Sequence, residues 1–404
     1  MTSRIYYTDP YCRQFDAVVT RAFEHEGRPA ALLDRTAFYP TSGGQPFDVG
    51  TLRAGGASGA GEAGEAGVVD VIDAEDEVVH VLSRPLAAGA AVNGEIDWTR
   101  RFDHMQQHTG QHVLSAAFDR LFDNRTVSFH MGAELSTIDL AKEMTWEQIA
   151  RAEDEANRVI WDNREVAIRF VSSEEASALP LRKEPARGGV LRLIDVHDFD
   201  LSACGGTHVA RTGAIGAILV PAVEKFKGGV RVTFVCGGRA LHVFRTLRES
   251  VAGSVRALSV LPRELPGAIE RMQAEAKDLR RTIKKLRESL AAQEGIRLAG
   301  EAGRAGGVVV ETLDGWDANG LKTIASEITS RTSAVVALFS TSPPIAVVIA
   351  RSADRSLDAG VVLRALTERF GGRGGGTADL AQGGGLSGSL SDIRAAAREL
   401  LKSS

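Results

Sequence analysis

Cysteine is scarce in this sequence: 404 residues contain only three, Cys12, Cys204 and Cys236. So small and odd a number argues against a disulfide framework and leaves each thiol available for packing or metal chemistry. The sequence also lacks an apolar run of about 18 residues, which argues against a membrane-spanning helix. Its first residues lack the basic and apolar segments of a secretory signal. We therefore expect a cytoplasmic protein.

An excess of positive charge is missing as well. The 48 Lys and Arg residues stand against 52 Asp and Glu, for a net charge of −4. A protein that binds nucleic acid through its overall charge would be basic, so any such contact must be local. The length predicts two to four domains, and the 44% hydrophobic and 25% charged content is typical of a globular protein.

The expected fold class is a multidomain α+β protein. Residues 1–95 contain short apolar runs between turn signals, which predict a small β-barrel or sandwich. Within them, residues 53–67 are almost wholly Gly, Ala, Ser and Glu, so we expect a flexible hairpin tip without function. Residues 96–250 predict an α+β domain that opens with a helix from Trp98 to about Phe122.

Residues 251–298 are expected to form a helical hairpin or short coiled coil. Apolar side chains recur there in steps of three and four, at Ile269, Met272, Ala276, Leu279, Ile283, Leu286 and Leu290. Residues 263–290 also carry eight Lys or Arg against five Asp or Glu. That charge fits a solvated helix as well as one that contacts RNA. Residues 299–404 alternate strand and helix patterns, which predicts a C-terminal α/β domain.

Two histidines on the expected helix could bind a metal. His108 and His112 in HTGQH are four residues apart, a spacing that stacks both rings on one helix face. Taken alone, such a pair is also compatible with ordinary core histidines.

A second pair, Cys204 and His208 in CGGTH, lies where two glycines let the chain curl. A buried free cysteine and a catalytic Cys/His pair are the other interpretations. Together the two pairs complete a tetrahedral set of nitrogen and sulfur ligands, for which Zn²⁺ is the best-suited ion.

Several motifs resemble the alanyl-tRNA synthetase editing domain and its free-standing AlaX-type relatives. The first two are HTGQHVLSAAF and DFDLSACGGTHVARTGAIG. TAFYPTSGGQPFDVGTL is similar to the signature of that family's β module, and KFKGGVRVTFVCGGRAL to the segment after its cysteine motif. The ending GGRGGGTADLAQGGG is similar to the DHHA1 domain. The resemblance covers nearly the whole chain, in the order of the long AlaX form.

This resemblance implies a trans-editing hydrolase that deacylates Ser-tRNA(Ala), and also Gly-tRNA(Ala). No aminoacylation domain precedes the β module and no P-loop is present, so we expect hydrolysis and not synthesis. Water bound to the zinc would be the catalytic group. Four protein ligands describe a closed site, so one ligand, first of all His208, would be loose, or the ion would expand its coordination. In another mechanism, zinc orients the substrate amino group.

The resemblance also assigns substrate contacts. Gln45, Gly43 and Gly44 would form a substrate-facing loop, although glycines also serve any tight turn. Ser128 and His130 would line the amino-acid pocket, where a hydrogen bond to the seryl hydroxyl would favour serine over alanine. Two further groups complete the assignment: Asp198 and Asp200, which would orient ligand imidazoles, and Lys225, Lys227 and Arg231, which would contact the 3′ end of tRNA.

Two other functions remain open from the sequence. One is a non-catalytic zinc protein that binds tRNA through a closed structural site. The other is a zinc hydrolase of another ester or amide. A homodimer formed through the C-terminal region is a further expectation.

Overall fold

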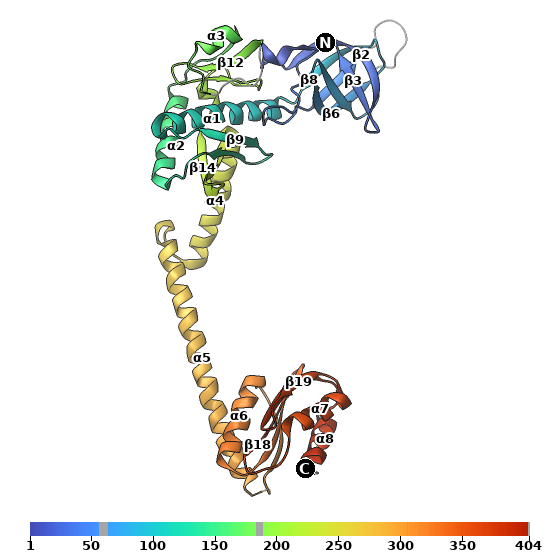
Figure 1. Ribbon diagram of the computed structural model, residues 1–404, viewed down its shortest axis with the longest axis vertical. Coiled ribbons are helices and arrows are strands. Elements are labelled where there is room, and N and C mark those ends of the chain that lie inside the picture. Colours follow the sequence, from blue (N-terminus) through green and yellow to red (C-terminus); the bar gives the residue numbers. More distant parts are fainter. Residues whose placement is uncertain (56–63, 183–188, 305, 403–404) are drawn as a thin grey trace. The chain divides into compact units, whose positions relative to one another are not determined.

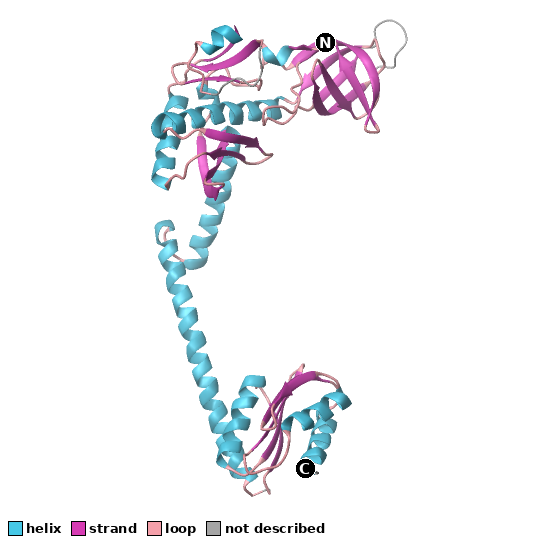
Figure 2. Cartoon of the chain, viewed as in Figure 1, coloured by secondary structure: helices cyan, strands magenta, loops and turns pink. Residues whose placement is uncertain are grey.

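The computed structural model describes residues 1–55, 64–182, 189–304 and 306–402. They form two compact units, Met1–Gly253 and Ser254–Ser404, and each has cores of its own. Figure 1 traces the elements along the chain, and Figure 2 separates helices from strands. The first two expected modules thus share one unit. No helix among the described residues is long and apolar enough to cross a membrane.

Six strands of the first unit close into a barrel in the order β2-β3-β7-β6-β5-β8 (Figure 1, blue). Alternate residues of β2 point inward, so that Phe15, Ala17 and Val19 belong to the barrel core. β5 and β6 form the expected hairpin, and residues 56–63 of its tip lie outside the described chain. The bounds are Gln14–His25 (β2), Arg28–Leu33 (β3), Gly50–Ala54 (β5), Glu65–Ala74 (β6), Glu77–Leu82 (β7) and Ala91–Ile96 (β8).

A short N-terminal segment and one long loop connect the barrel to the rest of this unit. β1 (Ser3–Arg4) pairs with β4 (Arg35–Thr36), and a 3-10 turn, Ile5–Tyr7, follows β1. The loop from β4 to β5 is anchored by Asp48, which is fully buried and paired with the equally buried Arg101. Asp48 also accepts a hydrogen bond of 2.6 Å from the Tyr39 amide. This anchor holds the GGQ segment against the following helix.

That helix, α1 (Trp98–Phe122), is the centre of the first unit. It begins at Asp97, whose side chain accepts a hydrogen bond from the Arg100 amide, and it ends at Asp123 in the left-handed conformation. Every residue from His104 to Phe118 except Gln106 is buried. Because the helix is covered on all sides, its histidines point into the interior rather than to solvent.

Two antiparallel sheets cover α1 (Figure 1). One has the order β14-β15-β10-β9 and the other β11-β12-β13. The strands are Thr126–Met131 (β9), Ser136–Leu140 (β10), Val166–Ser172 (β11), Val190–Val196 (β12), Asp200–Ala203 (β13), Ile218–Phe226 (β14) and Gly229–Cys236 (β15). The helices are α2 (Trp146–Trp161), which begins with a capping box at Thr145, α3 (Ser173–Ser177), a 3-10 turn at Thr212–Ile215, and α4 (Gly237–Leu258).

The second unit contains a five-stranded sheet with helices on both faces. Its order is β16-β17-β18-β20-β19, and only β16 and β17 are parallel. Val336 and Leu338 of β17 share a core with α5 and α6, whereas Ala337 and Phe339 share another with α7 and α8. The strands are Val308–Leu313 (β16), Val335–Ser340 (β17), Ile345–Arg351 (β18), Arg373–Gly376 (β19) and Leu380–Leu386 (β20). The helices are Leu265–Ala302 (α5), Ala318–Arg331 (α6), Ala359–Phe370 (α7) and Leu390–Lys402 (α8), with a 3-10 turn at Pro262–Glu264.

The expected heptad pattern lies on one continuous helix, α5. Its C-terminal part packs on α6 through Ala291, Leu298 and Ala302. The large side chains of the seam are instead between 40% and 59% exposed, at Ile269, Met272, Leu279, Ile283, Leu286 and Leu290. The helix is therefore present, and its pairing into a coiled coil stays a prediction.

Candidate metal centre

Four side chains that could bind a metal converge in the first unit: His108, His112, Cys204 and His208. Their ligand atoms all lie within 4.8 Å of one another. The Cys204 Sγ is 3.4 Å from Nε2 of His108 and 3.4 Å from Nε2 of His208. α1 supplies the first two, and the turn after β13 supplies the others. The structure thus brings together all four residues that the sequence predicts as ligands.

The turn between Cys204 and His208 needs a glycine at its centre. A Cβ on Gly206 would lie 2.1 Å from the His108 ring, so a side chain at this position would displace that imidazole. The turn is also clamped by Arg192, whose Nη1 donates to the carbonyls of Cys204 and Gly206 at 2.6 and 2.9 Å. The thiol and the His208 imidazole consequently face the α1 histidines.

The hydrogen bonds of His108 fix which ring nitrogen carries the proton. Its Nδ1 lies 2.8 Å from Oε1 of Gln45. The Thr207 amide, which can only donate, bonds the same oxygen at 3.1 Å, and the Gln45 amide nitrogen donates to the Thr207 hydroxyl at 2.8 Å. Because Oε1 can only accept, Nδ1 of His108 must donate. The lone pair is therefore on Nε2, which faces Cys204.

The other two histidines are fixed in the same way. Nδ1 of His112 donates to the buried Asp200 carboxylate at 2.9 Å, and Arg182 holds the other carboxylate oxygen at 2.5 Å. Nδ1 of His208 lies 3.2 Å from the Thr109 hydroxyl, which already donates to the Met105 carbonyl at 2.8 Å and so can only accept. Nε2 of both rings therefore faces the cluster, and in the neutral form of each ring this nitrogen carries the lone pair.

Protonation in this cluster is shifted by burial and by neighbouring charges. Burial opposes ionisation of Cys204, yet the adjacent His108 and His208 outweigh it and hold the pKa of the thiol well below its usual value. Burial, together with His108, lowers the pKa of His208 to about 3. Burial also disfavours a charged His112, but the hydrogen bonds and charges of Asp200 and Cys204 together outweigh it and raise the pKa of this ring to about 9. A metal would have to displace that proton, because it binds the neutral imidazole.

These residues fit a zinc ion. With Zn–S of about 2.3 Å and Zn–N of about 2.0–2.1 Å, a tetrahedral site separates sulfur from nitrogen by roughly 3.5 Å. The two Sγ–Nε2 distances of 3.4 Å agree with that value. Once His112 has lost its proton, three imidazole lone pairs and a thiolate lie close together in the interior, and a cation between them would relieve their repulsion. Ligand types and distances therefore both support zinc.

A cavity of about 710 Å³ opens beside the cluster. Besides three of the four ligands, its walls include Gly43, Gln111, Arg125, Ser128, Phe129 and Arg182. Gly44 packs under Phe129, because a Cβ there would lie 2.9 Å from the ring. Gln45, expected to face the substrate, is instead fully buried behind His108 with both amide atoms bonded.

Of the two residues expected in the amino-acid pocket, Ser128 lines the cavity and His130 does not. The Ser128 hydroxyl donates to Asp139 at 2.5 Å, so its lone pairs remain available as acceptors. The expected tRNA contacts Lys225, Lys227 and Arg231 are also absent from the walls.

Known proteins resemble this chain along almost its whole length. Family models match at residues 305–403 (DHHA1 domain), 14–100 (tRNA synthetases class II (A)) and 191–231 (Threonyl and Alanyl tRNA synthetase second additional domain). The alanyl-tRNA editing protein AlaX-L of Pyrococcus horikoshii is 31% identical over 393 residues, which cover 95% of this chain and 94% of the relative. The chain belongs to the AlaX-L family of alanyl-tRNA editing proteins.

Alanine–tRNA ligases match this AlaX-L family member over part of their length. The ligase of Pyrococcus furiosus is 34% identical over 72% of this chain, which corresponds to 32% of the ligase. The ligase of Thermococcus kodakarensis is 32% identical over 95% of this chain and 41% of the ligase. Among solved structures, the C-Ala domain of Aquifex aeolicus alanyl-tRNA synthetase is 28% identical and covers 23% of this chain, with a TM-score of 0.22.

The sequence interpretation missed several residues that the structure places at the site. Thr109 and Gln111 lie inside HTGQH, where helical spacing put them beside the ligands, so they could have been found. Arg125 and Arg182 carried no local signal, because only the fold brings them to the cavity. Asp200 orients His112 as expected, whereas Asp198 is exposed beside His197.

Proposed function

We propose that this protein is a zinc-dependent hydrolase that deacylates mischarged tRNA(Ala), Ser-tRNA(Ala) first and also Gly-tRNA(Ala). One observation carries the proposal: three imidazoles, each held by an acceptor on Nδ1, direct Nε2 toward the Cys204 thiol at the edge of a 710 Å³ cavity. The similarity to AlaX-L over 94% of that relative supports the substrate class.

His108, His112, Cys204 and His208 would hold the zinc. When bound, the ion supplies Lewis-acid chemistry, which polarises an ester carbonyl or makes water more acidic. The protein supplies the orientation: Gln45, Asp200 and Thr109 keep each ligand ring in the required tautomer. Ser128 is offered as the acceptor for the seryl hydroxyl, and Gly43 gives the substrate room at the cavity wall.

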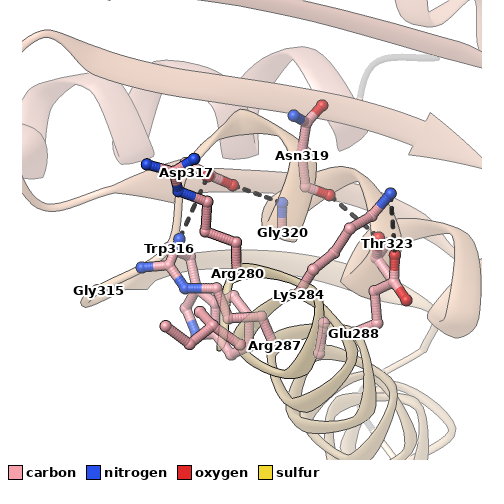
Figure 3. A pocket seen from close by; sticks show the side chains of 12 residues that line it. Arg280, Lys284, Arg287, Glu288, Gly315, Trp316, Asp317, Asn319, Gly320 and Thr323 are labelled. Carbon is pink, nitrogen blue, oxygen red and sulfur yellow. Dashed lines mark hydrogen bonds and ion pairs between the residues drawn. The ribbon is translucent and has the colours of Figure 1, made fainter. Parts of the chain in front are cut away.

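The second unit is proposed to bind the tRNA body. A cavity of about 310 Å³ lies between α5 and the start of α6 (Figure 3). Arg280, Lys284 and Arg287 of α5 line it together with Trp316 from the loop before α6. Lys284 and Arg287 pair with the acidic members Glu288 and Asp317 at 3.9 and 3.6 Å, which leaves Arg280 as the lining cation without such a partner among the described residues. Cations beside an aromatic ring suit phosphates next to an accessible base. This arrangement favours the RNA-contacting interpretation of α5 over a merely solvated face.

The test combines metal analysis with a deacylation panel. Purified protein should contain about one zinc per chain and release amino acid from Ser-tRNA(Ala) and Gly-tRNA(Ala) faster than from Ala-tRNA(Ala). Cys204→Ala and His108→Ala should lose most of the metal and the activity together. Zinc-loaded protein that leaves all three substrates intact would instead indicate a structural zinc site in a tRNA-binding protein. Activity confined to other esters would indicate a different hydrolase.

A further inference from the structure

The cavity beside the metal centre is larger than an amino acid requires. Its volume of about 710 Å³ lies in the range of about 300–1,000 Å³ that encloses whole small molecules. If the proposed function holds, the amino acid is esterified to the terminal adenosine of the tRNA. The space beyond the ligands must then receive that nucleoside and the phosphate on its 5′ side.

The described walls of this cavity carry positive charge without acidic residues. Two arginines line them, Arg125 and Arg182, and no Asp or Glu is among the lining residues. Arg182 is held by the Asp200 carboxylate through bonds of 2.5 and 3.3 Å. The Arg125 guanidinium, by contrast, makes no hydrogen bond or ion pair with any residue in the described parts of the chain. It is the cation of these walls that remains available to an anion.

The backbone around Arg125 is rigidly placed. The preceding residue, Asn124, is fully buried, and its amide group bonds both the backbone nitrogen and the carbonyl of Lys142, at 2.9 and 3.1 Å. The Arg125 carbonyl accepts a bond of 3.1 Å from the Ala141 amide. The exposed Arg125 side chain therefore starts from a fixed backbone position immediately before β9, next to cavity residues Thr126 and Ser128.

The three basic residues that the resemblance assigns to tRNA contact are less suited to bind an anion in this cavity. Lys225 pairs with Glu143 at 3.1 Å, Arg231 pairs with Asp139 at 2.7 Å, and neither they nor Lys227 line the cavity. A guanidinium can form two parallel hydrogen bonds to phosphate oxygens, which makes arginine well suited to such a contact.

We propose that Arg125 forms a phosphate subsite of this cavity, which binds the phosphodiester on the 5′ side of the terminal adenosine. The bond that breaks is the ester at the other end of that nucleoside, so Arg125 is a binding and positioning residue and not a catalytic one. It makes the enzyme select an aminoacylated RNA end over a free amino-acid ester.

Two minimal substrates test this inference: the seryl ester of adenosine and the seryl ester of adenosine 5′-monophosphate. Arg125→Gln should lower kcat/KM about tenfold for the phosphorylated ester, chiefly through KM, and change that of the unphosphorylated ester less than twofold. Arg125→Lys should recover part of the loss because it keeps the charge. Arg169→Gln, at an exposed arginine of β11 that does not line the cavity, is the matched control and should behave as wild type.

A second measurement covers full-length substrate. With Ser-tRNA(Ala), the salt dependence of kcat/KM should become shallower in Arg125→Gln by about 0.7–0.9 in the log–log slope, which corresponds to one lost phosphate contact. Equal losses on both minimal esters, or an unchanged salt slope in an active, zinc-loaded variant, would overturn the subsite. Wild-type protein that leaves Ser-tRNA(Ala) intact would overturn the proposed function instead.

Discussion

The orientation of the candidate metal ligands is controlled by residues that are not themselves in the ligand cluster. Gln45, Asp200 and Thr109 each accept a hydrogen bond from Nδ1 of a different histidine. Their acceptor roles are fixed in turn by Thr207, Arg182 and the Met105 carbonyl. Because a histidine nitrogen binds metal only through its lone pair, these contacts decide whether the three histidines can act as ligands.

Replacing Gln45 by leucine should therefore weaken zinc binding although no ligand is changed. The substitution removes the acceptor for the His108 proton, so the wrong tautomer becomes accessible, and we expect about a 10- to 100-fold loss of zinc affinity. Competition with a chromogenic chelator measures it. Gln106→Leu, which loses a bond from α1 to the Ala214 carbonyl away from the cluster, is the control. Equal affinities in the two variants would remove the orienting role of Gln45.

Ser128 should contribute to the choice between serine and alanine. Its hydroxyl proton is donated to Asp139, so an oxygen lone pair is free for the seryl hydroxyl, whereas Ala-tRNA(Ala) offers no such group. One uncharged hydrogen bond contributes about 0.5–1.5 kcal/mol, so Ser128→Ala should reduce the serine preference by roughly two- to tenfold. His130→Ala, which alters a residue outside the cavity lining, serves as the comparison. A retained preference in zinc-loaded Ser128→Ala would shift selectivity to another wall residue.

Sequence reasoning could find the candidate ligands and part of their surroundings, such as Asp200 and Ser128, but not the rest. HTGQH and CGGTH place histidine and cysteine at spacings that are typical of metal sites. Residue type and spacing can both be read from a single sequence. Gln45 lies 63 residues before His108. Nothing in its sequence motif distinguishes a residue that orients a histidine from one that contacts the substrate. No sequence motif marks Arg125 either, because its proposed role depends on a cavity wall that forms only when the chain folds.

Strands and helices can be predicted from the sequence where apolar residues recur with the period of that element. The alternation in β2 and the heptad pattern of α5 predict their types correctly. The glycine-rich segment near the C-terminus shows no such pattern, yet it folds into the paired strands β19 and β20. A Cβ on Gly374 would lie 2.6 Å from the Gln382 carbonyl, so glycine permits an unusually close strand pair there. Composition alone suggests a loop for such a segment.

The barrel carries a pH-sensitive element of its own, His80 on β7. Burial lowers the pKa of this histidine from 6.5 to about 4, and its ring bonds the Thr36 hydroxyl at 2.8 Å. Between pH 6.5 and about 4, His80 is protonated in the unfolded chain but remains neutral in the folded barrel. Stability should hence fall as the pH drops from about 6.5 to about 4, by roughly 3 kcal/mol in total from this residue.

Urea denaturation of wild type and His80→Gln at pH 7 and pH 5 measures this effect. The variant should be less stable at pH 7 but lose less stability on acidification, because glutamine does not titrate. His104, whose pKa burial also lowers, to about 3, is present in both proteins and cancels in the comparison. Parallel losses in the two proteins would show that His80 does not titrate in this window.

At the scale of the whole molecule, the two proposed tasks fall on different units. All four proposed ligands and the cavity belong to Met1–Gly253, whereas the basic face of α5 belongs to Ser254–Ser404. Removing residues 263–404 should weaken binding of Ser-tRNA(Ala) more than it slows hydrolysis at saturating substrate. Filter binding and single-turnover kinetics separate the two quantities. Truncated protein with full zinc but without its single-turnover rate would contradict this division.

The bond between Gln45 and the metal-binding part also sets an order of events during synthesis. Gln45 must meet Thr207, 162 residues later, before His108 is locked in its metal-binding form. Closing so long a loop costs entropy, and packing of the barrel and α1 contributes to offsetting that cost. Stable zinc uptake should therefore occur only after about half of the chain has left the ribosome, with the barrel already folded. Stalled nascent chains that end before and after His208 would show it: tight zinc retention by the shorter chain would rule out this order.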